Sequence, residues 1–174
     1  ARLLGQRTAE LHNVLAADDE NADFAPEAFT IFYQRSLYQS MRNLTGRVLQ
    51  SLEAQRKNIP EHLQAEAERI AQLDDAILNR FRRLIDRKIN AVRIRCHGDY
   101  HLGQVLFTGK DFCITDFEGE PLHPLSERRL KRNPLRDVAG MIRSFHYAAY
   151  AGLYQHIERG SLPPEHLPTF EAWA

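Results

Sequence analysis

The chain has 174 residues, a length that suits one domain or a fragment of a larger protein and excludes two complete large domains. With 43% hydrophobic and 26% charged residues, its composition is typical of a folded globular protein. The 23 basic and 23 acidic side chains balance, so no overall charge attracts nucleic acid or an anionic membrane surface. No apolar run in the sequence approaches the roughly 18 residues that a membrane span needs.

The cysteines and the first residues indicate the compartment. Cys96 and Cys113 stand apart, without the spacing of a zinc site, and are typical of reduced core residues. Residues 1–5 resemble neither a signal peptide nor the start of an open reading frame. We therefore expect a cytoplasmic fragment.

Apolar residues at helical spacing predict three helices in residues 1–90. The first has about four turns, with His12 near its apolar edge, and ends at an acidic run. The second begins at Pro26 and ends before Asn58. The third follows Pro60 and continues to about Lys88.

The pattern changes in the second half of the chain. Apolar residues alternate with arginines over 92–96, which predicts a half-buried strand. Residues 104–107 and 112–115 flank a turn-forming tetrad and predict a β-hairpin. Residues 119–134, with three prolines and four basic residues, predict a long functional loop, and the helical pattern returns from Leu135 to about Glu158.

These elements divide the chain into a helical part (1–90), a strand, loop and hairpin (91–121), and a loop with C-terminal helices (122–174). The predicted fold class is mainly α with a small β platform (α+β).

Ionisable residues gather at 97–104, which read His-Gly-Asp-Tyr-His-Leu-Gly-Gln. A His-x-Asp triplet followed five residues later by an amide matches the order of the protein-kinase catalytic loop. In that loop Asp accepts the hydroxyl proton and Asn binds Mg²⁺. Asp99 is therefore the candidate base, and Gln104 stands where those kinases have Asn.

A second block, Asp-Phe-Glu-Gly-Glu-Pro at 116–121, follows the hairpin. Asp116 occupies the place of the kinase Asp that binds Mg²⁺ between the phosphates of ATP. Phosphoryl transfer depends on positioning and charge neutralisation, so we expect Asp99 and Asp116 to divide these two tasks. The alternative is that both residues only end strands and cap turns.

Four further side chains are candidates for contact with the substrate or for the surroundings of the metal. His97 and His101 fit imidazoles that brace the loop better than they fit direct substrate contacts. Glu118 and Glu120 either extend the metal or sugar site or form ion pairs with the basic loop.

With both blocks in place, the sequence resembles the aminoglycoside phosphotransferase-like kinases. Among them it is most similar to bacterial maltokinases, whose blocks read His-Gly-Asp-x-His-x-Gly-Gln and Asp-Phe-Glu-Gly-Glu-Pro. The flanking residues 39–46 and 130–141 look most like the maltokinase domain that is fused behind trehalose synthase in bifunctional proteins.

The resemblance implies the C-terminal lobe of a protein-kinase-like fold that phosphorylates maltose to maltose 1-phosphate, with ATP and Mg²⁺, on a route from trehalose to α-glucan. It assigns Asp99 as the base and Gln104 and Asp116 as Mg²⁺ ligands. Asp137 is expected to have a structural role, as a tie between the following helix and the active-site loop. Phe170 and Trp173 either begin an aromatic sugar-binding region or pack in the core.

The sequence departs from these kinases in one respect. No Gly-rich loop and no candidate strand lysine precede Asp99, although kinases use both on the phosphates of ATP. We therefore expect the N-terminal ATP-binding lobe to be absent and the fragment alone to be inactive. The missing lobe and a fused trehalose synthase domain are the expected partners.

Other functions stay open. His97, Asp99 and His101 at alternate positions fit a metallohydrolase, which leaves the second block unexplained. A lobe without its N-terminal partner fits a non-catalytic, kinase-like helical binding module, although both aspartates argue against it. Nucleic-acid binding rests only on the basic residues of 128–132, without interleaved aromatics, so we expect neither nucleic acid nor a membrane as partner.

Overall fold

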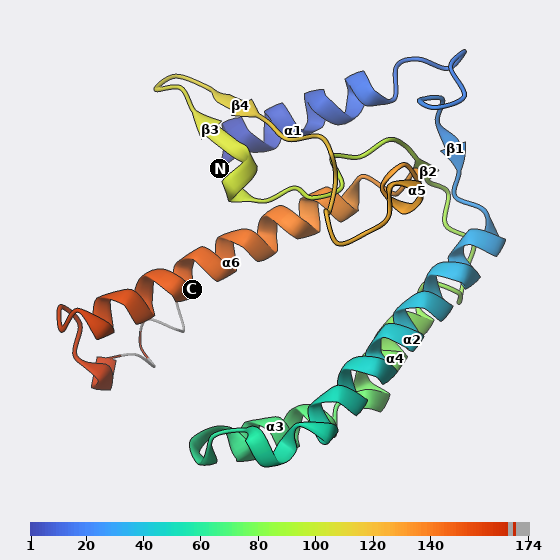
Figure 1. The fold of residues 1–174 in the computed structure, drawn as a ribbon. Coiled ribbons are helices and arrows are strands. Elements are labelled where there is room, and N and C mark those ends of the chain that lie inside the picture. Colours follow the sequence, from blue (N-terminus) through green and yellow to red (C-terminus); the bar gives the residue numbers. More distant parts are fainter. Residues whose placement is uncertain (167–168, 170–174) are drawn as a thin grey trace. The chain divides into compact units, whose positions relative to one another are not determined.

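The structure, a computed structural model, describes residues 1–166 and 169 of the chain (Figure 1). The chain forms two compact units, one made by residues 28–91 and the other by residues 1–27 together with the chain from 92 onward. The chain passes between them at two short strands, β1 (Glu27–Ala28) and β2 (Val92–Arg93). Phe170 and Trp173 lie outside the described residues.

The smaller unit is built on one long helix, α2 (Ile31–Ala54), which packs against α3 (Gln64–Ala71) and α4 (Asp74–Arg82). Two short 3₁₀ turns, η1 (Arg56–Asn58) and η2 (Glu61–Leu63), join α2 to α3. The prediction that this helix begins at Pro26 is wrong. Thr30 is extended, and its Oγ1 accepts a hydrogen bond of 3.2 Å from the amide of Tyr33, so it caps the helix four residues later.

The prediction of a single helix from Pro60 to about Lys88 is also wrong, because the structure has two helices, α3 and α4, in this range. Asp74 and Asp75 lie in the first turn of α4, where the positive end of the helix dipole favours carboxylates. Beyond α4, the fully buried Gln34 takes the place of helical hydrogen bonds. Its Nε2 donates to the carbonyls of Leu84 and Arg87, at 2.5 and 2.9 Å, and its Oε1 accepts from the amide of Ile89.

The larger unit contains α1 (Arg2–Leu15), η3 (Leu102–Gln104), β3 (Val105–Phe107), β4 (Phe112–Ile114), α5 (Leu125–Arg128), α6 (Leu135–Glu158) and η4 (Pro164–His166). The predictions for the first helix, the hairpin and the last long helix are confirmed. In the hairpin Val105 lies opposite Ile114 and Phe107 opposite Phe112. The turn closes where the amide of Thr108 donates to the Asp111 carbonyl over 2.8 Å, with Gly109 at a φ of +89°.

The strand expected over 92–96 is shorter than predicted. Only β2 is a strand, and beyond it Ile94 pairs with Arg132 through two backbone hydrogen bonds of 2.9 Å. The partner is a single residue of the loop 119–134, so the pairing does not extend into a longer β-ladder. Burial follows this pairing, since Ile94 is 3% exposed and Val92 is 48% exposed. The loop itself contains the short helix α5.

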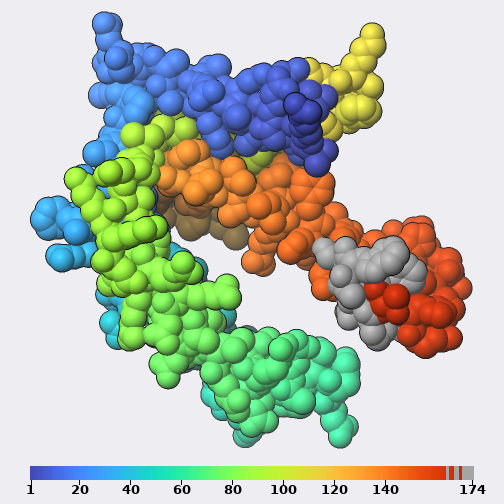
Figure 2. Space-filling model, turned by 180° about the vertical axis from the view of Figure 1, so that it is seen from behind, coloured from blue at the N-terminus to red at the C-terminus, as the bar shows by residue number. Residues whose placement is uncertain are grey.

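The core of the larger unit lies between α1, α6 and the loop that joins β2 to β3. Leu4 of α1, Tyr100 of the loop and Met141 of α6 are buried together, flanked by Leu102, Val105, Phe112 and Ile114. Figure 2 shows α1, in dark blue, over the first turns of α6, in orange. The predicted mainly α fold class with a small β platform is confirmed. Among the described residues, none of the helices combines the length and the apolar character needed to cross a membrane.

Candidate functional site

The loop 97–104 is held at its start by a carboxylate from α6. Asp137 lies in the first turn of that helix and is 2% exposed. Its Oδ2 accepts a hydrogen bond of 2.9 Å from the amide of His97, and its Oδ1 accepts one of 3.1 Å from the amide of Gly98. Gly98 has a φ of +88°, a conformation that side-chain-bearing residues rarely adopt. The helix therefore fixes the backbone immediately before Asp99.

Asp137 is ionised despite its burial. Burial alone would raise the pKa of this carboxyl group, because an apolar environment disfavours the charge. Hydrogen bonds from His12 and from the amides of Gly98 and His97 outweigh that effect, and the pKa of Asp137 lies below its ordinary value. The loop is thus anchored to a charged acceptor, which makes stronger hydrogen bonds than a neutral one.

His97 lies beneath the loop, with 1% of its surface exposed. Its Nε2 is 2.8 Å from the carbonyl oxygen of Thr115, the residue before Asp116. Its ring centroid lies 5.2 Å from that of Tyr100 and 5.0 Å from that of Phe117. The buried imidazole therefore links the block 97–104 to the block 116–121.

Asp99 faces an open groove. Its side chain is 25% exposed, and the groove is also lined by Tyr100, His101, Glu120 and a row of α6 residues: Arg136, Gly140, Arg143, Ser144 and Tyr147. His101 Nε2 lies 3.8 Å from Asp99 Oδ2, and His101 Nδ1 accepts from the amide of Gly103 over 3.1 Å. The α6 residues of the groove form one face of that helix and were not singled out from the sequence.

Gln104 is the last residue of η3, directly before β3, and it lies beside Asp116, two residues after β4. Gln104 Nε2 donates to Asp116 Oδ2 over 2.7 Å, and the amide of Thr115 donates to the Gln104 carbonyl over 2.9 Å. Among the described residues Asp116 alone combines a side chain with a positive φ, of 63°. This conformation is strained for a residue other than glycine, and such strain is often found at functional sites.

The two glutamates of the second block lie apart. Glu118 is exposed, and its carbonyl accepts from Arg128 Nη1 over 3.3 Å. Glu120 lines the groove and also a smaller pocket formed with Gly98, Gly119 and Arg128.

Gln104 and Asp116 fit a Mg²⁺ site. An amide oxygen and a carboxylate are the hard oxygen ligands that this cation prefers. The amide of Gln104 presents its nitrogen to Asp116 in this structure, and a half-turn of the amide would present its oxygen at the same place without other movement. In the described part of the chain, no three His, Cys, Asp or Glu side chains gather as metal ligands, so His97, Asp99 and His101 do not form the cluster considered for a metallohydrolase.

Sequence reasoning missed the contribution of α1. Thr8 Oγ1 and Tyr100 Oη form a buried hydrogen bond of 2.8 Å, and His12 Nε2 lies 2.9 Å from Asp137 Oδ2. Thr8 and His12 are four residues apart, so they lie on the same face of the helix. Polar residues at this spacing on an apolar face were the available signal.

Comparisons with known proteins identify relatives of the chain. The chain is similar to the glucosamine kinase of Mycolicibacterium smegmatis, with 44% identity over 68 residues, which cover 38% of this chain and 17% of that protein. It is 27% identical over 146 residues to the glucosamine kinase of Streptacidiphilus jiangxiensis, covering 83% of this chain and 29% of that protein. The chain therefore spans less than a third of these relatives.

Solved structures show the same fold. A glucosamine kinase in complex with glucosamine, ADP and inorganic phosphate superposes with a TM-score of 0.71 and 24% identity, over 97% of this chain and 38% of that one. Crystal form B of a glucosamine kinase gives a TM-score of 0.67 and 25% identity, over 87% and 33% of the two chains. The expected kinase-like fold is confirmed. The model of the APH phosphotransferase enzyme family matches residues 1–166, and the chain belongs to this family.

Proposed function

We propose that the chain is the catalytic C-terminal lobe of an ATP-dependent sugar kinase. The observation that supports this most is the arrangement of the two sequence blocks. Asp99 faces a groove, while Gln104 and Asp116, from the two ends of one hairpin, are in contact at 2.7 Å. Phosphoryl transfer to a hydroxyl group requires a proton acceptor and hard oxygen ligands for Mg²⁺, and His97, 2.8 Å from the Thr115 carbonyl, joins the two blocks that carry them.

Asp99 is the proposed base. Its carboxylate is half-buried in the groove, where an acceptor hydroxyl can reach it. As the hydroxyl oxygen bonds to the γ-phosphorus of ATP, its proton passes to Asp99 and ADP leaves. The hydrogen bonds of Asp137 to the amides of His97 and Gly98 keep the loop in place, and positioning accounts for much of catalysis in this reaction class.

Asp116 and Gln104 are the residues that would bind Mg²⁺. The cation, when bound, neutralises charge on the β- and γ-phosphates. The strained backbone of Asp116 aims its carboxylate at Gln104, and His97 supports that backbone from below through the carbonyl of Thr115.

The lobe is proposed to work as part of a longer cytoplasmic protein. This chain covers only 33% and 38% of the two solved glucosamine kinase chains that it matches. We infer that an N-terminal lobe supplies the nucleotide-binding elements, and that a trehalose synthase domain accompanies it as in the fusion proteins that residues 39–46 and 130–141 resemble.

Maltose is the proposed acceptor, on the resemblance of both blocks to maltokinases, and maltose 1-phosphate is the product. Glucosamine is the second candidate, because the curated relatives are named glucosamine kinases. Tyr147, 76% exposed beside the groove, offers an aromatic face on which a sugar ring can stack.

The test is a phosphorylation assay with the full-length parent protein, ATP, Mg²⁺ and a sugar panel that includes maltose and glucosamine. Asp99→Asn should lower kcat by about 10²- to 10⁴-fold and change KM little, since it removes the base and keeps the shape. Asp86→Asn, at an exposed position of the smaller unit, is the matched control and should keep full activity. Absence of turnover on every sugar, or full activity of Asp99→Asn, would contradict the proposal, and preference for glucosamine would replace maltose as acceptor.

A further inference from the structure

One face of α1 lies against the candidate site at three successive turns. Leu4, Thr8 and His12 are spaced four residues apart and are only 4%, 7% and 9% exposed. Leu4 packs with Tyr100 and Met141, and Thr8 bonds the hydroxyl of Tyr100. His12 is the nearest of the three to the C-terminal end of α1, and its Nε2 contacts Asp137. The face therefore contacts the loop 97–104 directly at Tyr100 and indirectly through Asp137.

The carboxylate of Asp137 accepts three hydrogen bonds. Oδ1 accepts from the amide of Gly98, whereas Oδ2 is shared by the amide of His97, at 2.9 Å, and by His12 Nε2, at 2.9 Å. Because an ionised carboxylate only accepts, His12 must donate through Nε2. The third donor comes from outside the loop, so it restrains the rotation of the carboxylate independently of the loop.

We propose that His12 is a positioning residue for Asp99, acting through Asp137. By fixing the carboxylate, His12 fixes the two amides that precede Asp99, and so the place of the proposed base in the groove. Without this donor, a buried carboxylate lacks one of its partners, and it can turn toward any other donor that becomes available. A displacement of about 1 Å at a reacting group can cost about a hundredfold in rate.

The alternative is that His12 only fills space beneath the loop. His12→Met keeps a side chain of similar size without a donor, whereas His12→Gln keeps an amide N–H that can reach Asp137. If His12 acts as a hydrogen-bond donor, His12→Met and His12→Gln should differ in kcat and in amide exchange. If it only packs, the two variants behave alike. His62→Met, at an exposed position of the smaller unit, is the matched control.

The experiment uses the full-length parent protein and two readouts. The first is steady-state kinetics with the accepted sugar: His12→Met should lower kcat by about 10- to 100-fold with sugar KM within about twofold, and His12→Gln should recover most of the loss. The second is amide hydrogen exchange, in which the peptide containing His97 and Gly98 should exchange faster in His12→Met than in His12→Gln or His62→Met. If His12→Met does not fold, His12→Asn, whose amide is too short to reach Asp137, takes its place.

This inference rests on the proposed kinase function. The kinetic and exchange readouts distinguish a failure of the kinase function from a failure of the role of His12. A wild-type protein inactive on every sugar overturns the proposed function, while the exchange data still decide whether His12 holds the loop. An active wild type together with unchanged kcat in His12→Met overturns the role of His12. Equal losses of kcat in Met and Gln, with equal exchange, also overturn it in favour of packing.

Discussion

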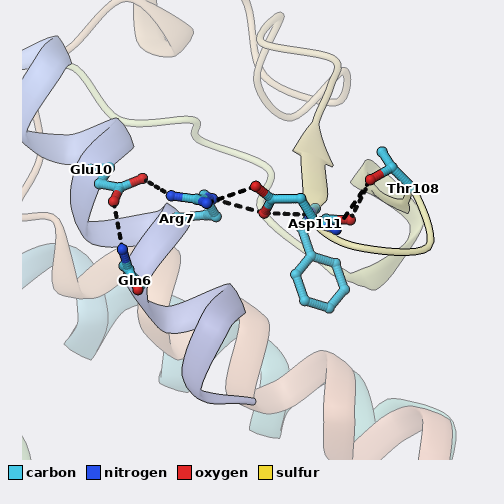
Figure 3. Close-up of polar contacts among 6 residues, drawn as sticks. Gln6, Arg7, Glu10, Thr108 and Asp111 are labelled. Atoms are coloured by element: carbon cyan, nitrogen blue, oxygen red, sulfur yellow. Dashed lines mark hydrogen bonds and ion pairs between the residues drawn. The ribbon is translucent and has the colours of Figure 1, made fainter.

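Arg7 of α1 binds the turn of the β-hairpin through Asp111. Arg7 Nε donates to Asp111 Oδ1 over 2.8 Å and Nη2 donates to Oδ2 over 2.6 Å, a paired geometry that suits a guanidinium and a carboxylate (Figure 3). Asp111 Oδ1 also accepts from the amide of Phe112, and Glu10 accepts from Arg7 Nη1 over 2.5 Å. The guanidinium of Arg7 holds the pKa of Asp111 below its usual range. The hairpin whose two ends present Gln104 and Asp116 is thus also attached at its turn.

Arg7→Met should loosen the hairpin turn. The pair is partly exposed, so we expect a small fall in melting temperature that shrinks at high salt, because salt screens exposed charges. A double-mutant cycle with Asp111→Asn should show a favourable coupling between the two residues. Arg69→Met, which breaks an exposed pair with Glu66 within one helix, is the control and should change melting little. A coupling energy of zero between Arg7 and Asp111 would show that the contact does not stabilise the turn.

Gly140→Ala should destabilise the protein. A Cβ at Gly140 of α6 would lie 2.8 Å from the carbonyl oxygen of Tyr100, so the candidate catalytic loop would have to move. We expect a loss of about 1 to 3 kcal/mol of unfolding free energy and, in the parent protein, lower activity. Gly152→Ala in the same helix has nothing within 4 Å and should stabilise by up to about 1 kcal/mol. Chemical denaturation measures both, and equal effects of the two variants would contradict the close approach.

The sequence predicted elements well where the pattern ends in a clear local signal. α1 and α6 show helical spacing up to an acidic run or a glycine, and the hairpin surrounds a turn tetrad with Gly109. The prediction from sequence failed where a side chain distant in the sequence decides where a helix ends. The third predicted helix stops at Arg82 and does not reach Lys88, because Gln34, from another helix, binds the backbone of the following residues.

The same limit applies to the site. Both sequence blocks were found from local order, and the structure brings Gln104 and Asp116 into contact, although their roles stay predictions. The contacts of Thr8 with Tyr100 and of His12 with Asp137 span 92 and 125 residues. No local pattern encodes contacts at such separations, because they depend on how helices pack.

The two cysteines should react very differently with iodoacetamide. Cys96 is largely buried, which together with the nearby charge of Asp137 raises the pKa of its thiol to about 12, whereas Cys113 is exposed. Since the thiolate is the reactive form, Cys96 at pH 8 should alkylate more than about a thousandfold slower in the native protein than in urea. Peptide mass spectrometry separates the sites, with Cys113→Ser as control. Rapid native labelling of Cys96 would show that its environment is open.

Asp137→Asn should lower the stability of the larger unit at neutral pH and flatten its acid dependence. The pKa of Asp137 is lowered in the folded protein relative to about 4 in the unfolded chain. The stability it contributes is therefore present above about pH 4 and is lost as the pH falls through the folded value. Breaking a buried, charged contact should cost about 2 to 4 kcal/mol at pH 7. Urea denaturation between pH 7 and pH 3 measures this, and the difference between wild type and Asp137→Asn should shrink on acidification. Asp86→Asn, at an exposed position, should stay parallel to wild type, and the same parallel behaviour from Asp137→Asn would contradict the ionised, hydrogen-bonded state of this carboxylate.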